Sequence, residues 1–357
     1  MKLRTLLVTL LLLPLGAASP SLSIPPVVQI ALDDGPHVRW EGHTATVTWV
    51  REGQAVTATR QGAFSLVLPG IAGAPLKLDP APLPPAVEEV ASADRILAVS
   101  DVHGNFQGLV TLLKAQGVID EKQRWRYGRG HLVVVGDVAD RGAQVTEIYW
   151  LLRSLEAQAQ QAGGATHLLL GNHEAMVLAG DLRYVNPKYL RSVEPPPSAQ
   201  FDAASELGRW LRSRPVMLRL GEFLFVHGGV SPEVLEAKLE VSRINATVRG
   251  ALGTRPKDAS GEAALLLGNR GPLWYRGLLP EGGPPQADDA HLQAVLAHFR
   301  VKALVVGHTT LPALAARHER RVYGIDAGLK DDRPGEAWIY EKRQIWRGRA
   351  DGGKEPL

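Results

Sequence analysis

Short runs of alternating apolar and polar residues occupy the first part of the chain after its N-terminal segment. Between residues 25 and 69 these runs include TATVTWV at 44–50 and AVTATR at 55–60, and Gly-containing pairs separate them. A period of two is typical of strands with one buried face. We therefore predict a β-rich appendage over residues 20–78, expected to cover a sheet edge, with a substrate-recognition lid as the alternative. The Pro-rich segment 79–93 then favours an extended linker.

Beyond residue 94 the pattern changes to continuous apolar runs that alternate with amphipathic stretches. The runs predict buried strands, and the amphipathic stretches predict helices. This repetition indicates an α/β domain with a largely parallel sheet, which we assign to residues 94–349, followed by a polar tail at 350–357. The expected elements are the strands 96–100, 131–136 and 167–171 and the helices 106–115 and 144–160.

Polar residues follow each of these strands directly. Two later apolar strands, in FLFVHGG (223–229) and ALVVGHTT (303–310), also run into a histidine. In α/β sheets ligands bind at the carboxyl ends of the strands, so we expect five strand ends to converge on one edge. The residues at these ends are Asp101, His103, Asp137, Asp140, Arg141, Asn172, His173, Glu174, His227 and His308.

The side chains at these strand ends include carboxylates, imidazoles and a carboxamide, which suit Mn, Fe or Zn. The chain has no Cys, so thiolate ligands, disulfides and a lipid anchor on cysteine are excluded. A carboxylate such as Asp137 can bridge two metal ions about 3.5–4 Å apart, a spacing that serves in-line displacement at phosphorus. The pattern therefore indicates phosphoryl transfer to water.

The motifs SDVHG, GDVADRG, GNHE, VHGG and GHTT occur in this order. Over residues 94–330 they resemble the calcineurin-like metallophosphoesterases and, within them, the phosphoprotein phosphatase family. The segments GNHEAMVLAGDLRYV (171–185), PLWYRG (272–277) and YGIDAGL (323–329) are most similar to the Shewanella-like phosphatases. The resemblance implies a four-layer αββα sandwich with two divalent metal ions per chain, with Mn as the first choice and Fe or Zn as the alternatives.

The same resemblance implies a role for each polar residue. Asp137 bridges the two metal ions, His173 protonates the leaving oxygen, and Asp140 orients the ring of His173. The implied phosphate-binding residues are Arg141, Arg276 and Asn172. The implied metal ligands are Asp101, His103 and Asp137 for the first ion and Asp137, Asn172, His227 and His308 for the second.

We therefore predict a dinuclear-metal phosphoprotein phosphatase that hydrolyses phosphate monoesters by direct attack of metal-bound water. The expected substrates are proteins or peptides with phospho-Ser or phospho-Thr, extending to phospho-Tyr, and small phosphomonoesters. Thr310 favours this branch, because many phosphodiesterases of the fold carry a second His there, and Asp140 and Glu174 point the same way. Ser100 replaces the usual Gly but removes no ligand. The alternatives are a diadenosine tetraphosphatase-like hydrolase and an inactive metal-binding protein.

Other polar and aromatic residues receive plainer interpretations. His131 and His167 begin strands and are expected to be solvated or capping residues. Glu174 is expected to make a buried hydrogen bond and not to catalyse. Trp274 and Tyr275 either line a groove for the leaving group or simply pack, and neither is placed in the catalytic set.

The segment 1–19 has the layout of a secretory signal peptide, with two basic residues, an apolar run over 6–15 and then small residues. The run of about ten residues is well short of the roughly twenty that span a bilayer, which favours cleavage over a retained anchor. We expect a periplasmic or secreted protein with no membrane span in the mature chain. The formal charge of +3 comes without a basic run interleaved with aromatics, so no nucleic-acid partner is expected, and no repeat or heptad predicts an oligomeric state.

Overall fold

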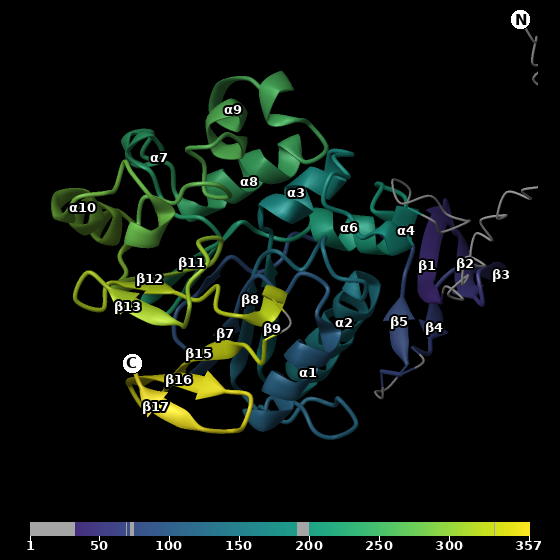
Figure 1. Ribbon diagram of the computed structural model, residues 1–357. Helices are drawn as coiled ribbons and strands as arrows, with labels where there is room; N and C mark the ends of the chain where they lie inside the picture. The colour runs from purple at the N-terminus through teal and green to yellow at the C-terminus, as the bar shows by residue number, and fades with distance from the viewer. Residues whose placement is uncertain (1–32, 69, 72–74, 191–199, 332) are drawn as a thin grey trace, which may run out of the picture. The chain divides into compact units, whose positions relative to one another are not determined.

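Two six-stranded sheets form the centre of the fold in the computed structural model, which describes residues 33–68, 70–71, 75–190, 200–331 and 333–357. All of these residues belong to one compact unit. The predicted signal peptide, 1–19, lies outside the described residues. Figure 1 shows α1 and α2 beside the first sheet and α7, α8 and α10 beside the second.

The first sheet has the strand order β17-β16-β15-β7-β8-β9. Strands β7, β8 and β9 pair in parallel, whereas β15, β16 and β17 add antiparallel strands. Its strands are β7 (Arg95–Val99), β8 (His131–Val135), β9 (Ala165–Leu169), β15 (Glu336–Glu341), β16 (Gln344–Arg349) and β17 (Lys354–Pro356). The helices that follow β7, β8 and β9 are α1 (Phe106–Ala115), α2 (Val145–Gln161), α3 (Asn172–Leu178), α4 (Pro187–Leu190) and α6 (Glu206–Arg212).

The second sheet has the order β13-β14-β12-β11-β10-β6 and is also mixed. Its strands are β6 (Glu89–Val90), β10 (Met217–Leu220), β11 (Phe223–Val226), β12 (Ala303–Val306), β13 (Ala315–Arg317) and β14 (Val322–Gly324). The helices between β11 and β12 are α7 (Pro232–Glu236), α8 (Val241–Ala251), η1 (Pro256–Asp258), α9 (Gly261–Leu267), η2 (Pro280–Gly282) and α10 (Asp289–Phe299), and η3 (Leu329–Asp331) follows β14.

An apolar layer joins the faces of the two sheets. Trp338 of β15 is fully buried, and its ring centroid lies 4.9 Å from that of Phe223 and 5.8 Å from that of Phe225, both in β11. Val133 and Val135 of β8 belong to the same buried cluster. The outer faces pack against helices, so the predicted four-layer αββα sandwich is confirmed.

The expectation of one largely parallel sheet with five ligand-bearing strand ends is wrong. Strands β7, β8 and β9 belong to the first sheet, and β11 and β12 belong to the second. The apolar runs look alike in the sequence because a strand buried on both faces has no alternation, whichever sheet it joins. The strand ends meet because the two sheets pack face to face.

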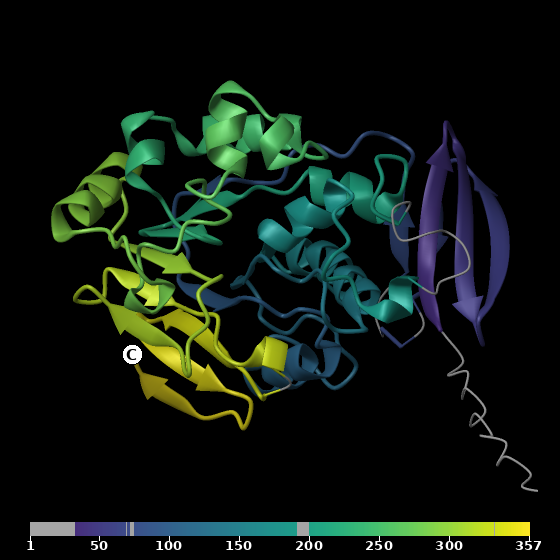
Figure 2. The ribbon, with the colours of Figure 1, turned by 45° about the horizontal axis from the view of Figure 1, so that its top comes forward.

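The predicted β-rich N-terminal region is present. It contains the antiparallel strands β1 (Asp34–Glu41), β2 (Thr44–Arg51) and β3 (Gln54–Gln61), seen in purple in Figure 2, and a hairpin of β4 (Phe64–Leu66) and β5 (Leu76–Leu78). Strand β1 packs against α6 and α2. The sheet therefore covers helices, and the expected cover over a sheet edge is not what the structure shows.

The segments before and after the predicted catalytic domain also contribute strands to the two sheets. Strand β6, within the Pro-rich segment 79–93, joins β10 in parallel, and β17, within the segment 350–357, joins β16. No helix in the described residues is long and apolar enough to cross a membrane.

Candidate metal centre

The turns that carry the polar residues have unusual backbone conformations. Six of these residues adopt left-handed φ angles, between 43° and 72°, a region that side chains other than glycine rarely enter. Hydrogen bonds between neighbouring turns hold them there, since His103 N donates to Asp137 O at 2.9 Å and Asp101 N donates to Gly136 O at 3.2 Å. Such conformations cluster at functional sites. The six residues are Asp101, His103, Asp137, Asp140, Arg141 and His308.

Glycine is required where the β8 and β9 turns approach each other. A Cβ atom on Gly171 would lie 2.1 Å from Asp137 Oδ1, and one on Gly136 would lie 2.6 Å from the Gly171 Cα. No side chain fits these spaces. The close approach lets the backbone N–H of His173 donate to Asp137 Oδ1 at 3.0 Å.

The carboxylate of Asp137 lies at the middle of the cluster. Its Oδ2 atom is 3.3 Å from His227 Nε2, 3.5 Å from His103 Nε2 and 3.9 Å from His173 Nε2. All four side chains are buried. Two groups of potential ligands, each with its ligand atoms within 4.8 Å of one another, share this carboxylate. The groups are His103, Asp137 and His173, and Asp137, His227 and His308.

Backbone carbonyls fix the tautomers of the histidines. His103 Nδ1 bonds to Ala139 O at 2.8 Å and His227 Nδ1 bonds to Val135 O at 2.8 Å. A carbonyl can only accept, so each Nδ1 carries a proton, and each Nε2 is the ring nitrogen that faces Asp137. This arrangement is the one in which histidine ligates metals.

The other predicted ligands lie in the same cluster. Asp101 Oδ2 accepts from Ser100 Oγ at 2.6 Å and from His308 N at 2.9 Å. Asn172 Oδ1 lies 3.0 Å from His227 Nε2. His308 Nε2 donates to Trp274 O at 3.2 Å, which leaves its Nδ1 as the acceptor. The structure therefore brings all six predicted ligands together.

The electrostatics of the cluster favour cations. Burial alone would lower the pKa of His227, but the charges of Asp137 and Asp101 raise it to about 10. Burial, together with nearby positive groups, lowers the pKa of His103 to about 4 and that of His308 to about 2. His103 and His308 are therefore neutral near pH 7, which is the ligating form of imidazole.

His173 and Asp140 form a buried pair beside the cluster. His173 Nδ1 donates to Asp140 Oδ2 at 2.7 Å. Burial opposes the charged imidazole, but this bond and the charge of Asp137 outweigh it and raise the pKa of His173. A protonated imidazole at this place can donate a proton from Nε2.

The two predicted phosphate-binding arginines occupy different surroundings. Arg141 is exposed, and its backbone N–H donates to Tyr184 O at 2.8 Å. Its guanidinium carbon lies 5.6 Å from the centre of the Tyr184 ring. Arg276 donates to the backbone carbonyl of His308, and its Nη2 lies 3.4 Å from His308 Nδ1. Arg276 thus adjoins a predicted ligand, while the Arg141 side chain forms no hydrogen bond or ion pair within the described part of the chain.

Glu174 braces the turns, as the sequence indicated. Its two carboxylate oxygens accept five hydrogen bonds of 2.8–2.9 Å, and the side chain is fully buried. The donors are the N–H groups of Asp137, Val138, Ala139 and Gly171 and the hydroxyl of Tyr149.

Two residues near the cluster were not found from the sequence. Asp326 is buried, and Lys330 Nζ lies 2.6 Å from its Oδ2 and also contacts the Thr310 hydroxyl. Burial and the charge of Asp101 raise the pKa of Asp326 to about 6. The segment YGIDAGL contains Asp326, but a lone Asp four residues before a Lys carries no signal for this contact.

The interpretation of His167 as a solvated or capping residue is wrong, whereas His131 is half-buried at the start of β8. His167 is 8% exposed, and its Nε2 lies 2.9 Å from His131 Nδ1, with the two rings stacked 5.3 Å apart. Burial, and then the neighbouring His131, lowers the pKa of His167 to about 3. The pairing follows from the parallel register of β8 and β9, which the sequence alone does not reveal.

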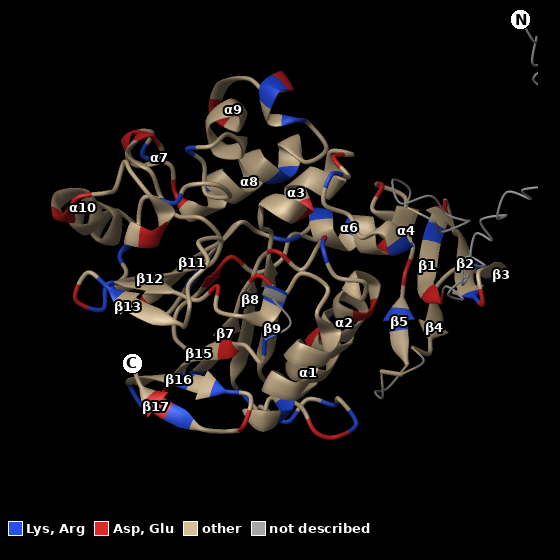
Figure 3. Cartoon of the chain, in the orientation of Figure 1, with Lys and Arg blue, Asp and Glu red and all other residues tan. Residues whose placement is uncertain are grey.

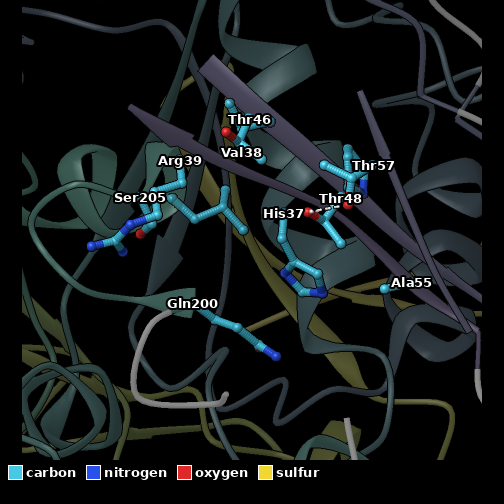
Figure 4. Close-up of a pocket in the computed structure, with 11 residues that line it drawn as sticks. His37, Val38, Arg39, Thr46, Thr48, Ala55, Thr57, Gln200 and Ser205 are labelled. Carbon is cyan, nitrogen blue, oxygen red and sulfur yellow. Dashed lines mark hydrogen bonds between the residues drawn. The ribbon is translucent and has the colours of Figure 1, made fainter. Parts of the chain in front are cut away.

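A cavity of about 340 Å³ lies apart from the cluster, between the N-terminal sheet and α6. His37 and Thr48 line it from the sheet, and Gln200 and Ser205 line it from the other side (Figure 4). None of the predicted ligands or phosphate-binding residues lines this cavity.

The sandwich and the ligand cluster at its strand ends together define a metallophosphatase. Residues 94–312 match the calcineurin-like phosphoesterase family, and the chain belongs to this family. It is accordingly a hydrolase of phosphate esters from a family that uses divalent metal ions.

Relatives within the family include protein phosphatases. An uncharacterised protein of Schizosaccharomyces pombe is 31% identical over 68% of this chain and 75% of its own length. Shewanella-like protein phosphatase 2 of Arabidopsis thaliana is 29% identical over 60% of this chain and 66% of its own length. The solved cold-active protein-tyrosine phosphatase of a psychrophilic Shewanella aligns with a TM-score of 0.82 at 32% identity, over 91% of this chain and 99% of that one.

Proposed function

We propose that this protein is a dinuclear-metal phosphoprotein phosphatase that hydrolyses phosphate monoesters on Ser, Thr and Tyr side chains. The observation that carries the proposal is the shared carboxylate of Asp137, which belongs to both groups of potential ligands, with the His173–Asp140 pair beside it. The relatives named as protein phosphatases support the substrate class. Export to the periplasm, as the sequence of residues 1–19 suggests, belongs to the same proposal.

The donor set fits two divalent metal ions. Asp101, His103 and Asp137 would hold the first ion, and Asp137 would share the second with Asn172, His227 and His308. Oxygen and imidazole donors without thiolates suit Mn, with Fe or Zn as alternatives. Such ions, when bound, lower the pKa of water and offset the negative charge of the phosphate.

His173 supplies the proton that the leaving oxygen needs. Its Nδ1–H is held by Asp140, so Nε2 is the nitrogen that faces the cluster, and Asp140 favours the charged, proton-donating form. General acid catalysis of this kind contributes roughly 10²–10⁴-fold. Asp140 acts through His173 and serves as a positioning residue.

Arg141 and Arg276 bind the phosphate oxygens, together with Asn172. The exposed guanidinium of Arg141 is free to form a bidentate pair with two of these oxygens. Arg276 is held next to His308 by its bond to the backbone carbonyl, so it brings positive charge close to the proposed second ion site. Preorganised donors of this type stabilise charge that develops during phosphoryl transfer.

Metal-stripped protein reconstituted with Mn, Fe, Zn or Fe with Zn tests the proposal. With the right metal it should hydrolyse p-nitrophenyl phosphate and phosphopeptides. Asp137→Asn should lose bound metal and activity together, whereas His173→Asn should keep the metal and lose roughly 10²–10⁴-fold in kcat. A strong preference for bis-p-nitrophenyl phosphate or diadenosine tetraphosphate would replace the proposal with a nucleotide-directed enzyme. Two bound metal equivalents without turnover would indicate an inactive binding protein.

A further inference from the structure

A groove with a cavity volume of about 700 Å³ opens beside the predicted ligand Asn172. One wall is formed by α3 and the turn after it, residues 175–183, and the other by residues 252–257, Leu267 and Trp274. Asn172 is one of its lining residues, so the groove adjoins the candidate metal centre. A group bound in this groove would lie next to a phosphate held by the centre.

The groove has an apolar interior and a basic rim. The larger aliphatic side chains that line the interior are Met176, Leu182, Leu252 and Leu267. The rim carries three basic residues and one acidic residue, Arg183, Arg255, Lys257 and Asp181, for a net charge of 3 − 1 = +2. In Figure 3 blue segments mark the connection that leads into α9, above α3.

The three basic residues are not equivalent. Arg183 forms a bidentate pair with Asp181, with contacts of 2.7–3.0 Å, so its charge is already matched. Arg255 and Lys257 are exposed, and neither side chain forms a hydrogen bond or ion pair with any other described residue. These two cations are the ones available to a ligand.

The length of α3 approximates the distance from the centre to the rim, because a Cβ atom on Gly253 would lie 3.6 Å from Leu178 O at the end of this helix. The seven residues of α3, Asn172–Leu178, rise about 10 Å at about 1.5 Å per residue. An extended peptide advances about 3.3 Å per residue, so about three residues bridge this length. In a peptide whose phosphorylated residue lies at the centre, the residue about three positions along the chain would therefore reach the rim.

We propose that this groove binds the peptide that flanks the phosphorylated residue and selects substrates with Asp or Glu about three positions from it. The apolar interior accepts the intervening side chains, and Arg255 and Lys257 pair with the acidic one. The exposed cations at the rim complement an acidic side chain, and this charge complementarity favours an acidic peptide as the occupant. This inference rests on the proposed phosphoprotein phosphatase function and adds its sequence preference.

The test uses the metal-loaded full-length enzyme and matched phosphopeptides that carry Glu, Ala or Lys three positions before or after the phosphorylated residue. One of the two Glu positions should give a kcat/KM about five- to tenfold above that of Ala, mainly through KM, because exposed charge pairs are individually weak. The preference should shrink at high salt. The double variant R255E/K257E should instead favour the Lys peptide.

Two controls separate the rim from general effects. The variant R255A/K257A removes the two cations of the rim and should lose the preference for Glu. The control variant K122A/R129A removes two exposed positive charges outside the groove and should keep it. Both variants should hydrolyse p-nitrophenyl phosphate, which has no flanking peptide, at the rate of the parent enzyme.

The possible outcomes are distinct. No preference for either Glu peptide in the parent enzyme, or an unchanged preference in R255E/K257E, would overturn the groove proposal while activity on monoesters persists. If substitution of Arg255 and Lys257 changed the hydrolysis of diadenosine tetraphosphate and not that of peptides, the groove would bind nucleotides. That result would also overturn the groove proposal. Absence of any activity on monoesters would be a failure of the proposed function itself.

Discussion

Single residues at the candidate centre are held in conformations and spaces that allow little change. Residues other than glycine with left-handed φ angles cost free energy, of order 1–3 kcal/mol each. Those at the strand ends persist because hydrogen bonds between neighbouring turns, and from the backbone N–H groups to the Glu174 carboxylate, fix them. The sequence predicted which residues meet, because each motif follows an apolar strand. It could not predict the hydrogen bond from Tyr149 to Glu174, because Tyr149 lies within a helix, or the Asp326–Lys330 contact, because a lone Asp four residues before a Lys carries no signal for it.

Gly171→Ala tests the close approach of the two turns. The added Cβ would lie 2.1 Å from Asp137 Oδ1, so the carboxylate must move, and metal affinity should fall roughly 10–100-fold, as for other losses of ligand support. Calorimetric titration of metal-stripped protein with metal measures this affinity. Gly250→Ala in α8, where a Cβ meets nothing within 4 Å, is the matched control and should bind metal normally. Equal affinities in the two variants would contradict the prediction.

Asp140→Asn tests the support of His173. Loss of the charged partner removes a contribution that raises the pKa of His173, so the alkaline limb of the kcat profile should move to lower pH. We expect kcat to fall roughly ten- to hundredfold, and more for phosphoserine peptides than for p-nitrophenyl phosphate, whose leaving group needs little protonation. An unchanged pH profile, or equal losses on both substrates, would mean that Asp140 does not act through His173.

At the scale of elements, the strands and helices follow the apolar pattern closely. The predicted helix 106–115 coincides with α1, and the strands at 96–100, 131–136 and 167–171 overlap β7, β8 and β9. The assignment of strands to sheets was wrong because continuous apolar runs do not reveal which neighbour a strand pairs with. Pairing also decides which side chains meet across strands, as His131 and His167 do.

The buried His167, which lies against the half-buried His131, should make the protein sensitive to acid. The pKa of His167 is lowered to about 3 in the folded state, against about 6.5 when unfolded. Below pH 6.5 the unfolded chain therefore binds a proton that the folded chain does not, and stability falls as the pH falls. When the pH falls from 7 to 4.5, this group alone should lower the free energy of unfolding by about 2–3 kcal/mol.

Urea unfolding of metal-stripped protein at pH 7 and pH 4.5 measures this loss. His167→Gln should reduce the difference in the free energy of unfolding between the two pH values by about 2 kcal/mol, whatever its effect at pH 7. A variant with the same pH dependence as the parent would show that the pair titrates normally.

At the scale of the whole molecule, the N-terminal sheet is joined to the catalytic sandwich by polar and apolar contacts. Trp40 is buried, and its Nε1 donates to Glu206 at 2.9 Å, while Trp150 Nε1 donates to Pro36 O at 2.9 Å. The sequence indicated a separate β-rich region but not its contact surface, because a strand pattern shows that one face is buried and not what buries it.

Trp40→Ala should therefore affect stability and not catalysis. Removal of this buried ring leaves a cavity and takes away one hydrogen-bond donor to Glu206, and the free energy of unfolding should fall by about 3–5 kcal/mol. The kcat of the folded variant on p-nitrophenyl phosphate should stay within about twofold of the parent, because none of these contacts involves a predicted site residue. A large fall in kcat with unchanged stability would instead support a lid function for the sheet.

The proposed ligands are contributed by both sheets, and they are far apart in the sequence, from Asp101 to His308. Bound ions would thus link two distant parts of the chain. Because they would bind only the folded state, each site would add RT ln(1 + [M]/Kd) to the free energy of unfolding, where [M] is the free metal concentration. Each tenfold rise in free metal above Kd should add about 1.4 kcal/mol per site and raise the melting temperature. Resistance to heat would then follow the supply of free metal, and the metal-free protein would stay folded but with a lower melting temperature.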